Sequence, residues 1–228
     1  MSFFLDEVAR NLVATPRSLP VVRESRVDEL RGQFRKPGEA SFFYRDHHFQ
    51  YDAVKVLPGE YFVSHVDLVI MTVLGSCISA CIWDGKAQAG GMNHFMLPDG
   101  DGADGAGRYG SYAMELLINE MLKKGARRES LQAKIFGGAQ VMTGFTTMNV
   151  GERNTKFVID YLATERIPVV SQDVLDIYPR KVCFFPLTGK VLVKRLAHSH
   201  PETLAVGERK GNAVTVVKAT AGGSIDLF

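Results

Sequence analysis

The chain has 228 residues, of which 46% are hydrophobic and 23% charged, and its formal net charge is +2. This length and composition are those of one ordinary globular domain with appendages. The small net charge gives no reason to expect a nucleic-acid partner, because proteins that bind nucleic acids concentrate positive charge.

Residues 1–7 contain neither the basic segment nor the apolar segment of a signal peptide. The longest uncharged run, Leu68–Trp83, is slightly short for a membrane span and is interrupted by polar residues and a glycine. We therefore expect no direct membrane insertion. Three cysteines in a chain without a secretion signal indicate reduced thiols and a cytoplasmic protein.

Residues 1–54 show weak hydrophobic periodicity and are interrupted by three prolines. We expect an N-terminal extension there, with one short helix near Asp6–Val13. The predicted domain spans residues 55–197, and the polar residues 198–228 are expected to form an irregular C-terminal tail.

The predicted domain begins with strands. Residues 55–61 are interpreted as a strand and a turn, and Leu68–Leu74 is rich in the β-branched residues that favour strands. Residues 89–97 predict a further strand. In residues 77–83, which lie between these two strands, side chains alternate between two faces. One face carries Cys77, Ser79, Cys81 and Trp83, and the other carries Ile78, Ala80 and Ile82.

A Gly/Asp-rich loop is expected at residues 98–107, followed by an amphipathic helix. Gly125 can adopt the left-handed conformation that ends such a helix. The apolar stripe of the helix has the spacing i, i+3, i+4, i+7 and i+8 and consists of Met114, Leu117, Ile118, Met121 and Leu122.

A short strand at residues 133–136 precedes a second amphipathic helix, which Asn149 and Glu152 begin as a capping box. Residues 168–170 predict a strand, and residues 182–196 predict a hairpin. This order predicts an α+β fold, a layered α/β sandwich. Its mixed β-sheets pack together, and the amphipathic helices lie on the outside.

Cys77 is the strongest candidate for chemistry, because the preceding turn, Gly75-Ser76, would present its sulfur to a cleft. Backbone N–H groups in such a turn could also bind an oxyanion. His94 lies near the end of the next predicted strand, and a histidine within reach would promote the nucleophilic thiolate. The alternative is a buried cysteine and a core histidine, and packing is the role expected for Cys81 and Cys183.

A third group would fix the imidazole tautomer, as in other catalytic triads. Thr72 lies just upstream of the cysteine and is one candidate, although an ordinary strand threonine looks the same in a sequence. Asn93 is another candidate, but its side chain would point away from that of His94, because neighbours in a strand alternate.

Other patterns are weak. His47-His48, and His198 with His200, lack the cysteine or carboxylate spacing of a metal site, so no metal is expected. Gly90-Gly91 and Gly137-Gly138 have neither the Gly-Lys-Ser/Thr ending of a phosphate loop nor a full dinucleotide pattern. We expect these glycines to mark tight backbone packing, and we expect no cofactor.

Five ordered segments stand out: 72–77 (TVLGSC), 91–98 (GMNHFMLP), 109–114 (YGSYAM), 134–139 (KIFGGA) and 149–154 (NVGERN). Together they resemble the CheD family of bacterial chemoreceptor glutamine deamidases. The resemblance covers roughly residues 55–196. The resemblance is specific because all five segments occur in order. No single segment would identify the family.

The resemblance implies hydrolysis of selected glutamine side chains to glutamate on methyl-accepting chemotaxis receptors, with release of ammonia. It implies that Cys77 is the nucleophile and His94 its base. An upstream threonine is the usual third member, and Thr72 is the nearest match, although some members have one more residue before the cysteine. The family fold is an α/β sandwich related to the deamidase domain of cytotoxic necrotizing factor toxins.

Some members of the family also bind the CheC phosphatase, so the alternative function is a chemotaxis binding or regulatory module that acts mainly through a CheC-type phosphatase. A cysteine peptidase is a third possibility, but no peptide-binding signature is visible. Residues 173–180, which replace a Gly-rich stretch of many members, and the N-terminal extension bear on partner contacts. A receptor is a long helical coiled coil, so we expect an open groove at Cys77.

Overall fold

The structure is a computed structural model that describes residues 25–97, 103–141, 150–197 and 225–227. Several expectations fall outside these residues. They are the helix near Asp6–Val13, the capping residue Asn149, and the pair His198 and His200.

The described helices are α1 (Val27–Gly32), α2 (Ala103–Lys123) and α3 (Val150–Thr164), with a 3-10 turn at Arg128–Ser130. The described strands are β1 (Phe42–Asp46), β2 (Tyr51–Lys55), β3 (Tyr61–Ser64), β4 (Val69–Leu74), β5 (Ile78–Asp84), β6 (Ala89–Asn93), β7 (Gln132–Gly137), β8 (Val169–Val174), β9 (Arg180–Phe185), β10 (Lys190–Arg195) and β11 (Ile225–Leu227).

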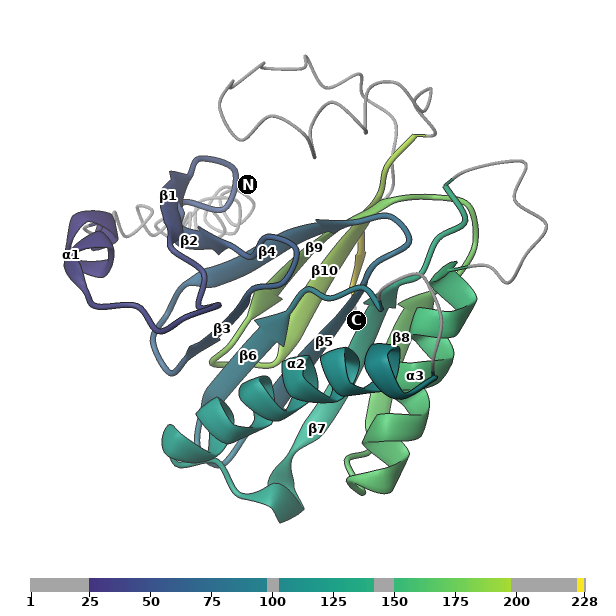
Figure 1. The fold of residues 1–228 in the computed structure, drawn as a ribbon. Helices are drawn as coiled ribbons and strands as arrows, with labels where there is room; N and C mark the ends of the chain where they lie inside the picture. The colour runs from purple at the N-terminus through teal and green to yellow at the C-terminus, as the bar shows by residue number, and fades with distance from the viewer. Residues whose placement is uncertain (1–24, 98–102, 142–149, 198–224, 228) are drawn as a thin grey trace, which may run out of the picture.

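These strands form two mixed sheets (Figure 1). The six-stranded sheet has the order β1-β2-β4-β9-β10-β11, and the five-stranded sheet has the order β3-β6-β5-β7-β8. Each sheet contains one parallel pair, β2 with β4 and β7 with β8. Helices α2 and α3 cover one face of the five-stranded sheet (Figure 1), and the six-stranded sheet packs on the other. The predicted α+β sandwich is confirmed.

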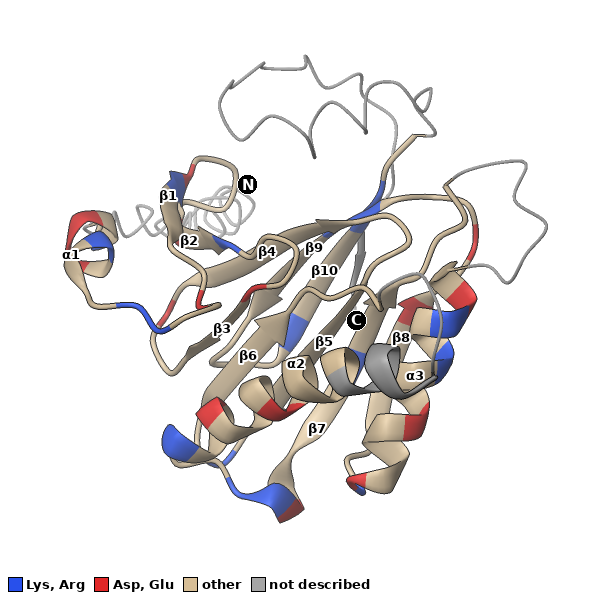
Figure 2. Cartoon of the chain, in the orientation of Figure 1, with Lys and Arg blue, Asp and Glu red and all other residues tan. Residues whose placement is uncertain are grey.

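Strand β5 has two buried faces, which explains why its residues 78–83 are uncharged. Ile78 and Ile82 belong to the core under the helices, whereas Cys81 and Trp83 belong to the core between the sheets. The predicted alternation is therefore confirmed. Full burial of each large apolar side chain contributes about 1.5–3 kcal/mol. Charged residues lie mostly on helices, turns and strand ends (Figure 2).

Helix α2 buries the predicted stripe, and Met114, Leu117 and Met121 have no exposed surface. It begins at Ala103, inside the segment predicted as a loop, and is longer than the stripe indicated. Gly125 adopts a φ of 92°. Its N–H donates to the carbonyl of Leu122, as expected for a left-handed cap.

Part of the expected N-terminal extension lies inside the fold. The boundary expected after residue 54 falls within β2, which pairs in parallel with β4 through Ala53 and Val69. Three consecutive residues of β2 are buried, 52–54, so the strand shows no alternation in the sequence. The expected C-terminal tail contributes β11, whose three residues pair with β10 and are too few to show a period.

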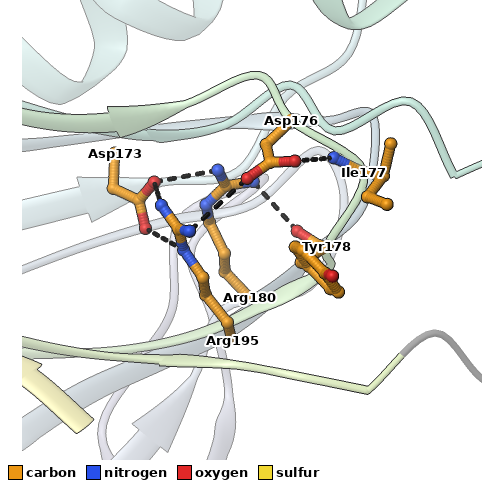
Figure 3. A network of polar contacts seen from close by, with 6 residues as sticks. All are labelled: Asp173, Asp176, Ile177, Tyr178, Arg180 and Arg195. Atoms are coloured by element: carbon orange, nitrogen blue, oxygen red, sulfur yellow. Dashed lines mark hydrogen bonds and ion pairs between the residues drawn. The ribbon is translucent and has the colours of Figure 1, made fainter. Parts of the chain in front are cut away.

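A buried ion pair joins the two sheets (Figure 3). Arg180 of β9 is fully buried, and its Nη2 donates to Asp173 of β8 at 2.8 Å. Arg195 of β10 donates to the same carboxylate at 3.0 Å and also pairs with Asp176. These contacts connect the edge strand of the five-stranded sheet to the six-stranded sheet.

The helices among the described residues include none with the length and apolar character needed to cross a bilayer.

Candidate active site

The turn that carries Cys77 connects the two sheets. Strand β4 lies in the six-stranded sheet and β5 in the five-stranded sheet, so residues 75–77 lead the chain from one sheet to the other. The sequence analysis placed this turn correctly. Its place at the crossover depends on which strands pair, and that is a tertiary property.

Cys77 and His94 project from the same face of the five-stranded sheet. Ile78 and Phe95 face each other and exchange both backbone hydrogen bonds, each of 2.9 Å. Both of these side chains lie in the core under the helices. Because side chains alternate, Cys77 and His94 point to the opposite face, toward the six-stranded sheet, as diagonal neighbours on adjoining segments.

Thr72 reaches His94 from the opposite sheet. Its Oγ1 lies 2.9 Å from Nδ1 of His94 and donates a hydrogen bond of 2.8 Å to the carbonyl of Val56. The backbone of His94 is held as well, since its N–H donates to the carbonyl of Glu60 and its carbonyl accepts from Gly59. Thr72 thus holds the imidazole, and residues 59 and 60 hold the backbone that carries it.

These contacts favour the tautomer of His94 that carries its proton on Nδ1. The carbonyl of Val56 can only accept, so the single hydroxyl proton of Thr72 is directed there. Oγ1 can then accept from Nδ1 of His94, and the Val56 carbonyl is also a hydrogen-bond acceptor for the imidazole, so both neighbours suit a proton on Nδ1. In the neutral ring, Nε2 carries a lone pair, and this buried atom has no hydrogen-bond partner among the described residues.

His94 is uncharged at neutral pH. The residue is 4% exposed, and burial lowers its pKa to about 4, with a smaller lowering from the positive charge of Lys55. The hydrogen bond to the Val56 carbonyl opposes this change without cancelling it. The ring is therefore able to accept a proton at Nε2 over the neutral range.

The three cysteines differ in their surroundings. Cys77 is 9% exposed. Burial raises the pKa of Cys81, and it raises that of Cys183 to about 11. Both remain protonated thiols at neutral pH, which fits the packing role expected for them.

The side chain of Asn93 is hydrogen-bonded to groups other than His94. Its Oδ1 accepts a hydrogen bond from the backbone of Ala80 at 2.9 Å, and its Nδ2 donates to the carbonyl of Ala113. Of the two candidates for the third group, Thr72 alone contacts the imidazole.

Two further segments contact the cysteine turn. Gly137 and Gly138 have φ values of 110° and 69°, and a Cβ on Gly137 would lie 2.2 Å from the carbonyl oxygen of Cys77. Only glycine permits this approach. From α3, the amide of Asn154 donates to the carbonyl of Ser76. The sequence analysis anticipated close packing at the glycines but assigned no role to Asn154.

Exposed apolar side chains lie beside the cysteine turn. Two surface depressions of about 300 and 590 Å³ are lined by residues other than Cys77 and His94. Val73, four residues before Cys77 in the chain, is 40% exposed, and Met96, whose sulfur lies 4.0 Å from Oγ of Ser76, is 44% exposed. Within the part of the chain that the structure describes, no group of three or more His, Cys, Asp or Glu residues is placed to hold a metal ion.

Comparisons of the sequence with known proteins agree on one family. A sequence model described as CheD chemotactic sensory transduction matches residues 96–195. A protein of Albidiferax ferrireducens named probable chemoreceptor glutamine deamidase CheD 1 is 83% identical over 220 residues, 96% of this chain and 94% of the relative. A protein of Methylobacillus flagellatus named probable chemoreceptor glutamine deamidase CheD is 52% identical and covers 83% of this chain and 96% of its own.

Among solved structures, the hypothetical protein YfiH of Bacillus licheniformis matches 51% of this chain and 49% of its own. The TM-score is 0.36 and the identity is 8%.

Proposed function

Because the chain belongs to the CheD family, we propose that it hydrolyses selected glutamine side chains of chemoreceptors to glutamate, with Cys77 as nucleophile and His94 as base. The names of the relatives support an amide hydrolase and a receptor substrate. One observation carries the catalytic assignment. Thr72 donates to the Val56 carbonyl and contacts Nδ1 of His94, which leaves Nε2 as the proton acceptor. Cys77 projects from the same face of the sheet as this imidazole.

The proposed reaction has two halves. Cys77 attacks the carboxamide carbon as Nε2 of His94 removes the thiol proton, and backbone N–H groups of the Ser76-Cys77 turn stabilise the oxyanion. His94 then gives its proton to the departing nitrogen, which leaves as ammonia. Nε2 of His94 next deprotonates a water molecule. This water attacks the thioester and releases glutamate and the Cys77 thiol.

The depressed pKa of His94 bears on how the thiol is activated. A resting pair of thiolate and imidazolium needs a protonated ring, whereas burial favours the neutral ring at neutral pH. Proton transfer during the attack fits this state better than a preformed ion pair. Thr72 contributes by holding the proton on Nδ1, so that the lone pair of Nε2 serves as the base.

The direct test is mass spectrometry of a chemoreceptor co-expressed with the protein. Conversion of glutamine to glutamate adds about one dalton, and ammonia release in a purified assay should accompany it. We expect the mass change at selected glutamines only. Release of a peptide amine instead would favour a peptidase, and an unmodified receptor would contradict the proposal. A partnership with a CheC-type phosphatase is also proposed, on the family resemblance alone.

The pH profile of wild-type kcat/KM should have an acid limb near pH 4 to 5, well below the value of about 6.5 expected for an ordinary histidine. The sign follows from the lowered pKa: His94 stays an unprotonated base until the pH falls through the folded value. Protonation also destabilises the fold between about pH 6.5 and 4, because the unfolded state binds the proton more tightly. Ammonia release and circular dichroism across this range separate the two effects, and a limb centred at 6.5 would contradict the assignment.

A further inference from the structure

All three carbonyl groups of the cysteine turn accept hydrogen bonds from other segments. The carbonyls of Gly75 and Cys77 accept from the backbone N–H groups of residues 139 and 138, each at 2.8 Å. The carbonyl between them, that of Ser76, accepts from Nδ2 of Asn154, also at 2.8 Å. The carbonyl in the middle of the turn is thus held by a side chain, whereas the carbonyls on either side are held by backbone N–H groups.

Asn154 has no exposed surface and joins both halves of the site. While Nδ2 donates to Ser76, Oδ1 accepts from the N–H of Leu97 at 3.0 Å. Leu97 follows His94 by three residues, so one amide group connects the segment of the nucleophile to that of the base. The orientation of the amide is unambiguous, because a carbonyl can only accept and an N–H can only donate.

We propose that Asn154 is a positioning residue that sets the orientation of the peptide between Ser76 and Cys77. A trans peptide is planar, so its N–H points opposite to its C=O. Holding the Ser76 carbonyl on Asn154 directs the N–H of Cys77 away from α3. The inference rests on the proposed function, in which N–H groups of this turn stabilise the oxyanion.

Helix α3 is held against the turn independently of this amide. Val158 and Leu162 are fully buried in the core under the helices. A Cβ on Gly151 would lie 2.1 Å from the carbonyl oxygen of Gly138, so helix and glycine segment are in close contact. Because these contacts remain, we expect variants at Asn154 to fold and to misplace only the turn.

The test compares Asn154→Asp with Asp84→Asn. The first keeps an acceptor for Leu97 but loses the donor to Ser76. The second is the reverse exchange at the far end of β5, where Asp84 is 1% exposed and accepts from Ser130 and Arg127. We expect Asn154→Asp to lower kcat about 10²-fold with little change in KM, since small misplacements have effects of this size.

The control should lose stability without a comparable loss of kcat. A kcat for Asn154→Asp within about threefold of wild type, in a folded variant, would overturn the proposal. An equal loss in Asp84→Asn at matched melting temperature would also overturn it. Asn154→Ala, which removes both hydrogen bonds, provides a second variant if the carboxylate prevents folding.

A second readout separates this inference from the proposed function. The amide ¹H–¹⁵N signals of residues 76 and 77 should move in Asn154→Asp and stay in place in Asp84→Asn, whether or not a receptor is modified. If the wild-type protein releases no ammonia, the proposed function fails while these signals still test the positioning. Unmoved signals in Asn154→Asp would overturn it.

Discussion

Replacing Cys77 by alanine is expected to lower the rate of receptor deamidation by about 10⁴-fold or more, as in other enzymes that lose a covalent nucleophile. Without the sulfur, water must attack an unactivated carboxamide directly. Hydrogen bonds to the turn are made by its backbone, so they survive the substitution and the fold should be retained. Ammonia release under single-turnover conditions, together with a melting curve, provides the measurement.

Cys183→Ala is the matched control. Cys183 is buried among Ala53, Val69 and Met71, in a cluster distinct from the one that contains Cys77, and burial raises its pKa to about 11. We expect near wild-type rates from this variant. Undiminished ammonia release from Cys77→Ala would contradict the assignment of Cys77 as the nucleophile.

The variant Thr72→Val tests the supporting residue of the same site. It deletes the hydroxyl that accepts from His94 but leaves the carbonyl of Val56, which also interacts with the imidazole. The rate loss should therefore be clearly smaller than that of Cys77→Ala. Equal losses in the two variants would contradict the supporting role given to Thr72.

Replacing Asp173 by asparagine is expected to lower the free energy of unfolding by about 3–5 kcal/mol. The change keeps the size of the side chain but leaves the fully buried guanidinium of Arg180 without its anion (Figure 3). An uncompensated buried charge is far more costly than the loss of an exposed pair. Denaturant unfolding of both proteins at neutral pH gives the difference directly.

Asp160→Asn makes the same chemical change in an exposed pair. Asp160 binds Lys156 one turn away on α3, and its side chain is 62% exposed. Such pairs contribute about 0.3–0.5 kcal/mol, so this variant should remain close to wild type. Similar losses in the two variants would show that burial of the Asp173 pair adds nothing.

The contribution of Asp173 should also depend on pH. Burial pushes its pKa upward, but hydrogen bonds from Arg180 and Arg195 outweigh this and lower the pKa overall. A lowered carboxyl pKa stabilises the fold above the unfolded value of about 3.9, and the gain is lost as pH falls through the folded value. The difference between wild type and Asp173→Asn should therefore shrink in strong acid.

Elements with a strong local pattern were predictable from the sequence. The alternating residues of β5 and the apolar stripe of α2 each bury large side chains in a regular period, which a sequence displays directly. Strand β2 was not predicted, because its consecutive residues 52–54 are all buried. Its place beside β4 depends on a partner that the local pattern does not reveal.

The candidate site shows the same division. Cys77 at a Gly-Ser turn and His94 in the next strand were candidates from residue type and spacing alone. That Thr72 and not Asn93 contacts the imidazole is visible only in the tertiary structure, because it depends on β4 lying opposite β6 across the core. Asn154 is 78 residues from Ser76, and no local pattern points from one to the other.

The sequence by itself determined the class of fold, the nucleophile and base as candidates, and the family resemblance. These depend on hydrophobic period, turn chemistry and ordered short segments, all of which are local. Only the tertiary structure decided the contact of Thr72 with Nδ1 of His94, the amide contact of Asn154 with the cysteine turn, and the buried pair of Asp173 with Arg180. Each is a directional contact between separate elements, and its geometry exists only once the sheets have packed.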